Sequence, residues 1–319
     1  MTIKQKKNTL TNKNIKKYLI AKKIVEKCSV RQLNSGLSNR NFLVISEKNR
    51  YNARTNKKRC TEFKNSLHNE SVILTFLGKE KITFSPRSIY YDSAKNIHVV
   101  QYVKGRQIYM KGLGDTNIKK VLKHLYIINS LAFDLKKYCE KNKIRYAKPV
   151  GNKKLLNSIK KKLKYLENER MYNFAVKWAT KKIEEDWENI KVQQKEIFLN
   201  HGDPVSNVIA NGKQVSLIDW EHAGLSYDPG LANIFLHGEL NNQKKKRMVT
   251  IYAKLSGNNY EKLLSDTLKR QKQLMIENIV DICEDHLKDR RLRKDKRKLD
   301  VALLKGRIKY YDRIFDLLT

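Results

Sequence analysis

Apolar and polar residues alternate in short runs over the first third of the chain, a spacing typical of β-strands. We expect five strands, at residues 30–33, 42–45, 51–55, 88–91 and 97–103. Between the third and fourth strands the apolar spacing becomes helical, over residues 63–77, and stops near Gly78. Three strands, a helix and two strands predict a small lobe over residues 25–103. A basic arm precedes this lobe within residues 1–24, with a helix expected to carry Tyr18, Leu19, Ile24 and Val25.

The apolar spacing is mainly helical in the rest of the chain. Asp115 and Thr116 are expected to cap a helix whose apolar face extends to Leu135. Further helices are expected at 153–169, at 172–192 and within 231–318.

Residues 197–218 interrupt the helical pattern with a predicted hairpin, whose strands 207–210 and 214–218 turn at Asn211-Gly212. The sequence therefore predicts an α+β fold with two lobes. The N-lobe has a small antiparallel sheet and one main helix, and the C-lobe, residues 104–319, is larger and mainly helical.

The chain is strongly basic. Its 319 residues are 40% hydrophobic, enough for a substantial core, and 68 Lys and Arg against 32 Asp and Glu give a net charge of +36. Such a charge suits a nucleic acid or an anionic membrane as partner, through the basic arm Lys4–Lys17 and the run Lys288–Lys298. The favoured explanation is instead a lysine-rich composition spread over a solvated surface. Nothing in the sequence indicates an oligomeric state.

The cysteines and the N-terminus bear on the cellular compartment. Cys28, Cys60, Cys139 and Cys283 are far apart, without a CxxC pair, so we expect reduced thiols that are mostly buried. The basic N-terminus lacks the apolar segment of a secretory signal, and no stretch has the about 18–20 apolar residues of a membrane span. We therefore expect a cytoplasmic protein.

One segment departs from the basic composition. From Glu196 to Gln243 there are six acidic residues and one basic residue, Lys213. Exclusion of cationic side chains suits a site for a divalent metal, a cationic substrate or both. A buried core segment would also exclude lysine, but it would exclude the acids too.

The acidic segment contains His201-Gly202-Asp203, then Asn207, then Ile218-Asp219-Trp220-Glu221. This pattern resembles the aminoglycoside phosphotransferase and choline kinase superfamily, which has a protein-kinase-like fold. Other resembling stretches follow in the family's order, with bacterial choline kinases and thiamine kinase-like proteins the most similar members: LNSGLSNRNFLV (33–44), RYNART (50–55), NESVILTFL (69–77), IHVVQYVKG (97–105) and YDPGLANIFL (227–236).

The resemblance implies an ATP-dependent, magnesium-dependent kinase. It implies that Asp203 orients the acceptor hydroxyl and accepts its proton, and that Asn207 and Asp219 bind Mg²⁺. Arg54, ion-paired with Glu70, would neutralise the nucleotide phosphates. The remaining nucleotide-binding residues implied are Gly36, Ser38 and Asn39 over the phosphates, and Gln101 and Val103 at the interlobe hinge.

The catalytic loop departs from the family pattern. Asp203 and Asn207 are four positions apart, whereas the family usually has five. Either the backbone re-routes through Pro204 and still delivers the Asn207 oxygen, or Ser206 takes part of the role. Asp203, Asn207 and Asp219 also have a structural interpretation as turn or strand-end caps, and His201 is interpreted as a buried brace of the loop.

The acceptor is less well indicated. An acidic and partly aromatic pocket for an amino-alcohol is expected, with choline, ethanolamine or a similar compound favoured and aminoglycosides or thiamine left open. Its expected residues are Trp220, Glu221, Tyr227, Asp228 and Glu239. The alternative function is that of a catalytically degenerate family member that binds nucleic acid or an anionic membrane.

Overall fold

The computed structural model describes residues 11–33, 39–56, 66–146, 148–237, 240–293 and 300–317. Gly36, Ser38 and Glu239, as well as Cys60 and parts of the two basic runs, lie outside these residues. Contacts divide the chain into two compact units: residues 1–108 with 201–223, and residues 109–200 with 224–319. The first unit thus extends beyond the predicted lobe 25–103 and includes the segment that contains Asp203, Asn207 and Asp219.

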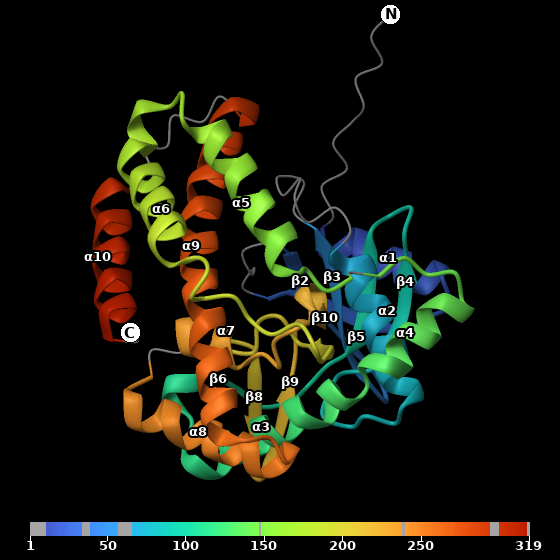
Figure 1. Ribbon diagram of the computed structural model, residues 1–319. Helices are drawn as coiled ribbons and strands as arrows, with labels where there is room; N and C mark the ends of the chain where they lie inside the picture. The colour runs from blue at the N-terminus through green and yellow to red at the C-terminus, as the bar shows by residue number, and fades with distance from the viewer. Residues whose placement is uncertain are drawn as a thin grey trace, which may run out of the picture. The chain divides into compact units, whose positions relative to one another are not determined.

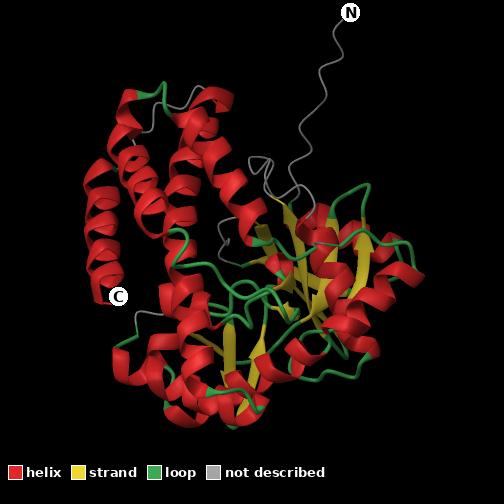
Figure 2. Cartoon of the chain, viewed as in Figure 1, coloured by secondary structure: helices red, strands yellow, loops and turns green. Residues whose placement is uncertain are grey.

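The first unit is built on an antiparallel sheet of the predicted strands. They are β1 (Cys28–Gln32), β2 (Asn39–Ser46), β3 (Arg50–Asn56), β4 (Ser88–Asp92) and β5 (Ile97–Gln101). Their spatial order is β1-β2-β3-β5-β4, and Figure 2 shows the strands in yellow. Both the strands and the antiparallel pairing are as the sequence predicts.

Two helices, α1 (Asn12–Ala21) and α2 (Ser66–Lys79), flank this sheet. Ile15 and Leu19 of α1 pack on a face that includes Phe42, Val44, Ala53, Ile97 and Val99. Side chains alternate along strands, so the residues next to Ala53 and Val99 face the other side, where α2 lies.

The N-terminal helix is shorter than predicted. It ends at Ala21, and Lys23 has a positive φ of 55°. Ile24 and Val25 therefore follow the helix instead of belonging to it. Val25 is nevertheless buried in the same core as Ile15 and Leu19. An apolar residue was therefore required there, and its spacing from the helical residues looked like a continuation of the helix.

A second sheet in the first unit consists of β6 (Arg106–Ile108), β8 (Val208–Asn211) and β9 (Gln214–Leu217), in the order β6-β8-β9. The predicted hairpin is present, but its turn is one residue later than predicted. Asn211 pairs with Gln214, so Gly212 and Lys213 form the turn, and Gly212 has the positive φ of 57° that a tight hairpin requires. The 3-10 helix η3 (Trp220–His222) follows β9.

The second unit is mainly helical. Its helices are α3 (Asp115–Ser130), α4 (Ala132–Lys141), α5 (Asn152–Leu166), α6 (Asn173–Asp186), α7 (Leu231–His237), α8 (Asn242–Ser256), α9 (Tyr260–Arg293) and α10 (Val301–Leu317). Short elements complete it: η1 (Met110–Gly112), η2 (Arg170–Tyr172), and a two-stranded sheet of β7 (Phe198–Asn200) and β10 (Gly224–Ser226). None of the described helices has an apolar segment long enough to cross a bilayer.

Helices α5, α6, α9 and α10 run alongside one another (Figure 1) and share one apolar core. Its fully buried members include Ile276, Ile279 and Cys283 of α9. The predicted helix from Asp115 towards Leu135 is divided at Leu131 into α3 and α4, and its N-cap is Gly114 instead of an Asp or Thr side chain. Cys28, Cys139 and Cys283 are buried free thiols, as expected.

Candidate active site

The β8–β9 hairpin brings Asn207 and Asp219 to the same end of the second sheet. Val208 pairs with Leu217, and one step further the Ile218 N–H donates to the Asn207 carbonyl at 2.9 Å. Asp219 follows directly, with φ and ψ both at 64°. Aspartate tolerates this left-handed conformation better than most residues, and the sharp turn ends the strand at this carboxylate.

Asp203 joins this group through Asn207. The Asn207 Nδ2 donates to the Asp203 carbonyl oxygen at 2.9 Å and to Asp203 Oδ2 at 3.2 Å. The loop between them therefore keeps both side chains together despite its shorter spacing. The Ser206 carbonyl accepts a hydrogen bond from the Gln107 side chain at 2.6 Å, which ties this loop to β6.

Gly202 and His201 hold the loop against η3. A Cβ at Gly202, whose φ is +86°, would lie 2.3 Å from the His222 carbonyl oxygen, so only glycine allows this approach. The His201 ring is fully buried and packs on Trp220 with ring centroids 4.4 Å apart. Burial lowers the pKa of His201 to about 4, although Asp203 and Asp219 act in the opposite direction. A neutral, enclosed imidazole suits the predicted bracing role.

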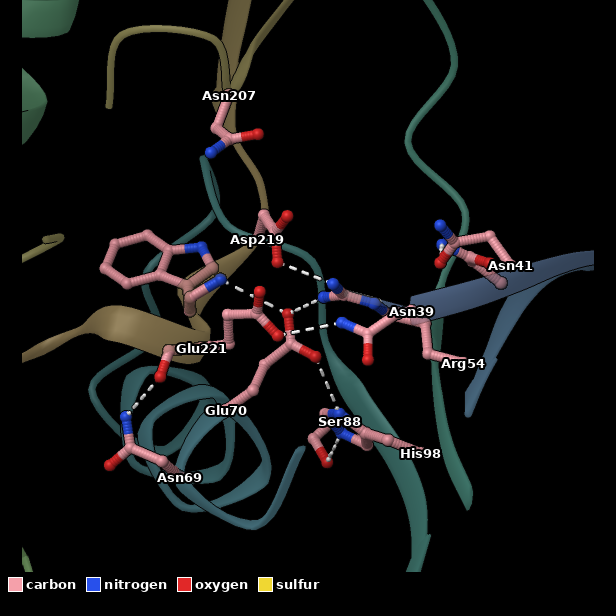
Figure 3. A network of polar contacts seen from close by, with 12 residues as sticks. Asn39, Asn41, Arg54, Asn69, Glu70, Ser88, His98, Asn207, Asp219 and Glu221 are labelled. Atoms are coloured by element: carbon pink, nitrogen blue, oxygen red, sulfur yellow. Dashed lines mark hydrogen bonds and ion pairs between the residues drawn. The ribbon is translucent and has the colours of Figure 1, made fainter. Parts of the chain in front are cut away.

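Arg54 links the loop to the first sheet. Its Nη1 donates to Glu70 Oε1, so the predicted ion pair is present, and its Nη2 donates to Asp219 Oδ1 at 2.5 Å (Figure 3). Burial opposes the charge on this guanidinium, but Glu70, Asp219 and Glu221 outweigh it and raise the pKa of Arg54. Arg54 is therefore a fixed positive charge among three carboxylates.

Glu70 has further partners on both of its oxygens. The Trp220 N–H donates to Oε1 at 3.2 Å, and His98 Nδ1 lies 3.0 Å from Oε2. Ser88 Oγ lies 3.1 Å from the other ring nitrogen of His98. Burial alone would raise the pKa of Glu70, but Arg54 and His98 lower it well below its usual range, so Glu70 is ionised at neutral pH.

Glu221 is also bound within the first unit. Asn39 Nδ2 donates to Glu221 Oε2 at 2.8 Å, and the Asn69 side chain donates to the carbonyls of Glu221 and Ala223 at 3.0 and 2.8 Å. Burial and the neighbouring Asp219 raise the pKa of Glu221. The side-chain donor of Asn39, predicted to face nucleotide phosphates, is thus engaged by Glu221 in this structure.

The donor atoms at the end of the hairpin fit a hard divalent cation. Of the two carboxylate oxygens of Asp219, Arg54 contacts Oδ1, and the Asp219 side chain is 33% exposed. Asn207 uses its N–H groups on Asp203, so its amide oxygen is the atom left for a ligand. No group of three or more His, Cys, Asp and Glu in the described part of the chain forms a metal site, so the fit depends on one carboxylate and one amide oxygen.

Figure 3 shows Asp219 between Asn207 and the Arg54–Glu70 pair. The other predicted nucleotide residues lie at the end of β5. Gln101 is the last residue of that strand, with an exposed side chain and its N–H donated to the Arg87 carbonyl at 2.9 Å, and Val103 is half-buried just beyond it.

The predicted acceptor residues fall into three groups. Trp220 is fully buried, and its Nε1 donates to the Leu217 carbonyl at 3.0 Å, so its ring has no surface to offer an acceptor, contrary to the prediction. Glu221 is nearly buried beside Asn39. Tyr227 and Asp228 belong to the second unit, where they line two cavities of about 60 and 170 Å³. Burial raises the pKa of Asp228 to about 6.

Sequence reasoning missed His98, Ser88 and Asn69. The register of β3 and β5 places His98 opposite Arg54, and cross-strand partners share a face of the sheet. Knowledge of this register would have indicated His98 as a site residue. Strand boundaries in the sequence do not set that register. Asn69 precedes Glu70 directly, but nothing in the sequence marks its side chain as a donor to the η3 segment.

No family model and no curated protein matches the sequence. Solved structures do match. A choline kinase, LicA, from Streptococcus pneumoniae is 18% identical over 95% of this chain and 98% of its own, with a TM-score of 0.65. An ethanolamine kinase from Plasmodium vivax is 15% identical over 99% and 91%, also at 0.65. Spectinomycin phosphotransferase APH(9)-Ia, in complex with ADP and spectinomycin, is 15% identical over 97% and 95%, at 0.56. The chain therefore has the protein-kinase-like fold of the choline kinase and aminoglycoside phosphotransferase superfamily, as the sequence resemblance implies.

Proposed function

We propose that this protein is a kinase that transfers the γ-phosphate of ATP to a hydroxyl group of a small molecule. The observation that carries this proposal is the convergence of Asp203, Asn207 and Asp219, with Arg54 bridging Asp219 and Glu70. Phosphoryl transfer requires mainly positioning and charge neutralisation, and these side chains supply both. The shared fold with small-molecule kinases supports the same activity.

Each side chain has a proposed task. Asp203 orients the acceptor hydroxyl and accepts its proton. Asn207 and Asp219 would hold Mg²⁺ through their oxygens, and the ion, when bound, neutralises phosphate charge. Arg54 stays charged at any working pH and presents that charge to the nucleotide phosphates, held in place by Glu70. Gln101, at the end of β5, and Val103, just beyond it, are proposed to contact the nucleotide.

We propose a cationic amino-alcohol, such as choline or ethanolamine, as the acceptor. The acidic segment Glu196–Gln243 supports this choice, because carboxylates without neighbouring lysines attract an ammonium group. Glu221, Tyr227 and Asp228 are the described candidates for that contact, and Glu239 belongs to the same proposal. Aminoglycosides and thiamine are alternative cationic acceptors.

Labelled ATP tests the proposal with choline, ethanolamine, thiamine and an aminoglycoside as acceptors, with magnesium and with a chelator in its place. The expected result is one labelled phospho-acceptor that forms only with magnesium. Absence of product with every acceptor, together with no loss of ATP, would reject the kinase.

A second candidate function is binding to a polyanion, and helix α5 favours it. Lys153, Lys154, Lys160, Lys161 and Lys164 are exposed on this helix, which has no acidic residue. Lys162 is engaged instead by Asp281 at 2.5 Å. An exposed row of cations attracts phosphate groups through an electrostatic attraction that salt screens.

Binding to duplex DNA and to phosphatidylserine vesicles at two salt concentrations tests this second function. Polyanion binding predicts affinity that falls steeply with salt, weakens when the five exposed lysines become glutamine, and is unchanged by Asp219→Ala. If the protein is a kinase without this second function, we expect little binding to the DNA or to the vesicles.

A further inference from the structure

We infer that His98 is a positioning residue that makes Arg54 divide its guanidinium between Glu70 and Asp219. For its effect on nucleotide binding this inference rests on the proposed function. Its structural part does not, because it concerns which atoms of Glu70 are left for Arg54.

Arg54 and His98 are direct cross-strand partners. They are paired in the register of β3 and β5, so both side chains leave the same face of the sheet, towards Glu70 on α2. Arg54 takes Oε1 of Glu70 and His98 takes Oε2 at 3.0 Å. Figure 3 shows the carboxylate held between the two side chains. Both oxygens are engaged, so the carboxylate plane is fixed.

Hydrogen bonding also sets the tautomer of His98. An ionised carboxylate can only accept, so the ring nitrogen facing Glu70, Nδ1, carries a proton. The other nitrogen, Nε2, faces the Ser88 hydroxyl at 3.1 Å, which can donate to it. The ring is fully buried, and Tyr91 stacks edge-on against it with centroids 5.9 Å apart. The imidazole is thus held from both sides with its N–H directed at Glu70.

Arg54 could bind Glu70 with both of its terminal nitrogens. Its Nε is buried and has no hydrogen-bond partner among the described residues, so the carboxylate contacts come from Nη1 and Nη2. Arginine and carboxylate prefer a two-bond fork, and Nη1 with Nη2 would form one with the two oxygens of Glu70. His98 prevents the fork because it occupies Oε2. Without the fork, Nη2 remains on Asp219 at 2.5 Å, at the proposed metal ligand.

Two substitutions separate the N–H of His98 from its volume. His98→Leu removes the donor, which frees Oε2 to pair with Arg54 Nη2 and draws this nitrogen away from Asp219. His98→Asn loses the Ser88 contact as well, but an asparagine amide places an N–H close to the position of Nδ1. His98→Leu keeps most of the volume without the N–H, whereas His98→Asn keeps an N–H in a smaller side chain, and denaturant unfolding measures the loss of stability in each.

Crystal structures of both variants and their affinity for ADP with magnesium test the inference. In His98→Leu we expect Glu70 Oε2 on Arg54 Nη2, no contact from Nη2 to Asp219, and a dissociation constant raised about tenfold. In His98→Asn we expect the wild-type contacts and a dissociation constant within about twofold of wild type.

An unchanged Arg54–Asp219 contact in His98→Leu, or equal nucleotide affinities of the two variants, would overturn the inference and leave the kinase proposal intact. A wild-type protein that binds no nucleotide would instead reject the proposed function. In that case the movement of Arg54 in the His98→Leu crystals would still decide the positioning role.

Discussion

Arg54 is a single buried cation that interacts with three carboxylates of the candidate site. Its guanidinium contacts Glu70 and Asp219 and feels Glu221 as a third negative charge. Two carboxylates in contact with one cation leave a net negative centre, which suits a site that must also attract a divalent ion. Lysine in its place would carry the same charge but lacks the planar fork that reaches two acids at once.

Gly202 is the residue where backbone geometry most directly limits the loop. We expect Gly202→Ala to lower the free energy of unfolding by about 2–4 kcal/mol, because its Cβ would lie 2.3 Å from the His222 carbonyl at a positive φ. Gly212→Ala is the matched control: it also has a positive φ, but no atom lies within 4 Å of its Cβ position, so a loss of about 1 kcal/mol is expected. Urea unfolding of both variants gives the comparison, and equal losses would contradict the close packing of the loop.

The raised pKa of Asp228 predicts that the stability of the protein depends on pH. Burial raises its pKa from the ordinary value of 3.8 to about 6, so between these values the native state binds more protons than the unfolded chain. Its contribution to stability is therefore complete below about pH 4 and is lost as the pH rises through 6, on the order of 3 kcal/mol in all.

Asp228→Asn removes this titration and keeps an oxygen to accept from the main chain. The unfolding free energy of wild type minus that of the variant should therefore fall between pH 4 and pH 7. Denaturant titrations across that range measure this difference. A difference that does not change with pH would contradict a buried Asp228 carboxyl with a raised pKa.

At the level of the elements, the hairpin β8–β9 determines where the site residues lie. The sequence indicated this hairpin from its Asn-Gly pair, and the pairing of Asn207 with Ile218 brings the two predicted metal ligands together. The turn shifted by one residue because Asn211 joins the ladder opposite Gln214. Turn residues mark where a hairpin reverses but do not fix which of them stay paired.

The packing of α9 gives a prediction at this scale. Ile276 is fully buried in the core shared by α5, α6, α9 and α10, whereas Ile282 on the same helix is only partly buried. We expect Ile276→Ala to cost about 2–5 kcal/mol of unfolding free energy and Ile282→Ala distinctly less, because the first leaves the larger cavity. Chemical denaturation measures both; a larger loss for Ile282→Ala would contradict the described orientation of the helix.

For the whole molecule, the sequence allowed the fold class to be predicted, because long periodic segments and the ordered motifs of one superfamily agree. It did not allow the three-residue strands β6, β7 and β10 to be predicted, since such short segments have no measurable period. The grouping of residues 201–223 with the first unit was also missed. That grouping depends on long-range pairing, such as β6 with β8, which local patterns do not encode.

The site was predictable to a similar degree. Asp203, Asn207, Asp219 and the Arg54–Glu70 pair stood out by residue type and order. The contact from Arg54 to Asp219 and the role of His98 needed coordinates, because they join residues on strands whose register the sequence leaves open.

The proposed activity requires that the Asp203 carboxylate and the Asp219 carboxylate serve phosphoryl transfer from ATP. The most direct test is steady-state transfer to the best acceptor, with magnesium titrated, for wild type, Asp203→Asn and Asp219→Asn. We expect kcat to fall about 10²–10⁴-fold in Asp203→Asn, and we expect Asp219→Asn to require much more magnesium for any turnover. Wild-type rates in Asp203→Asn, or turnover in Asp219→Asn with an unchanged magnesium requirement, would contradict it.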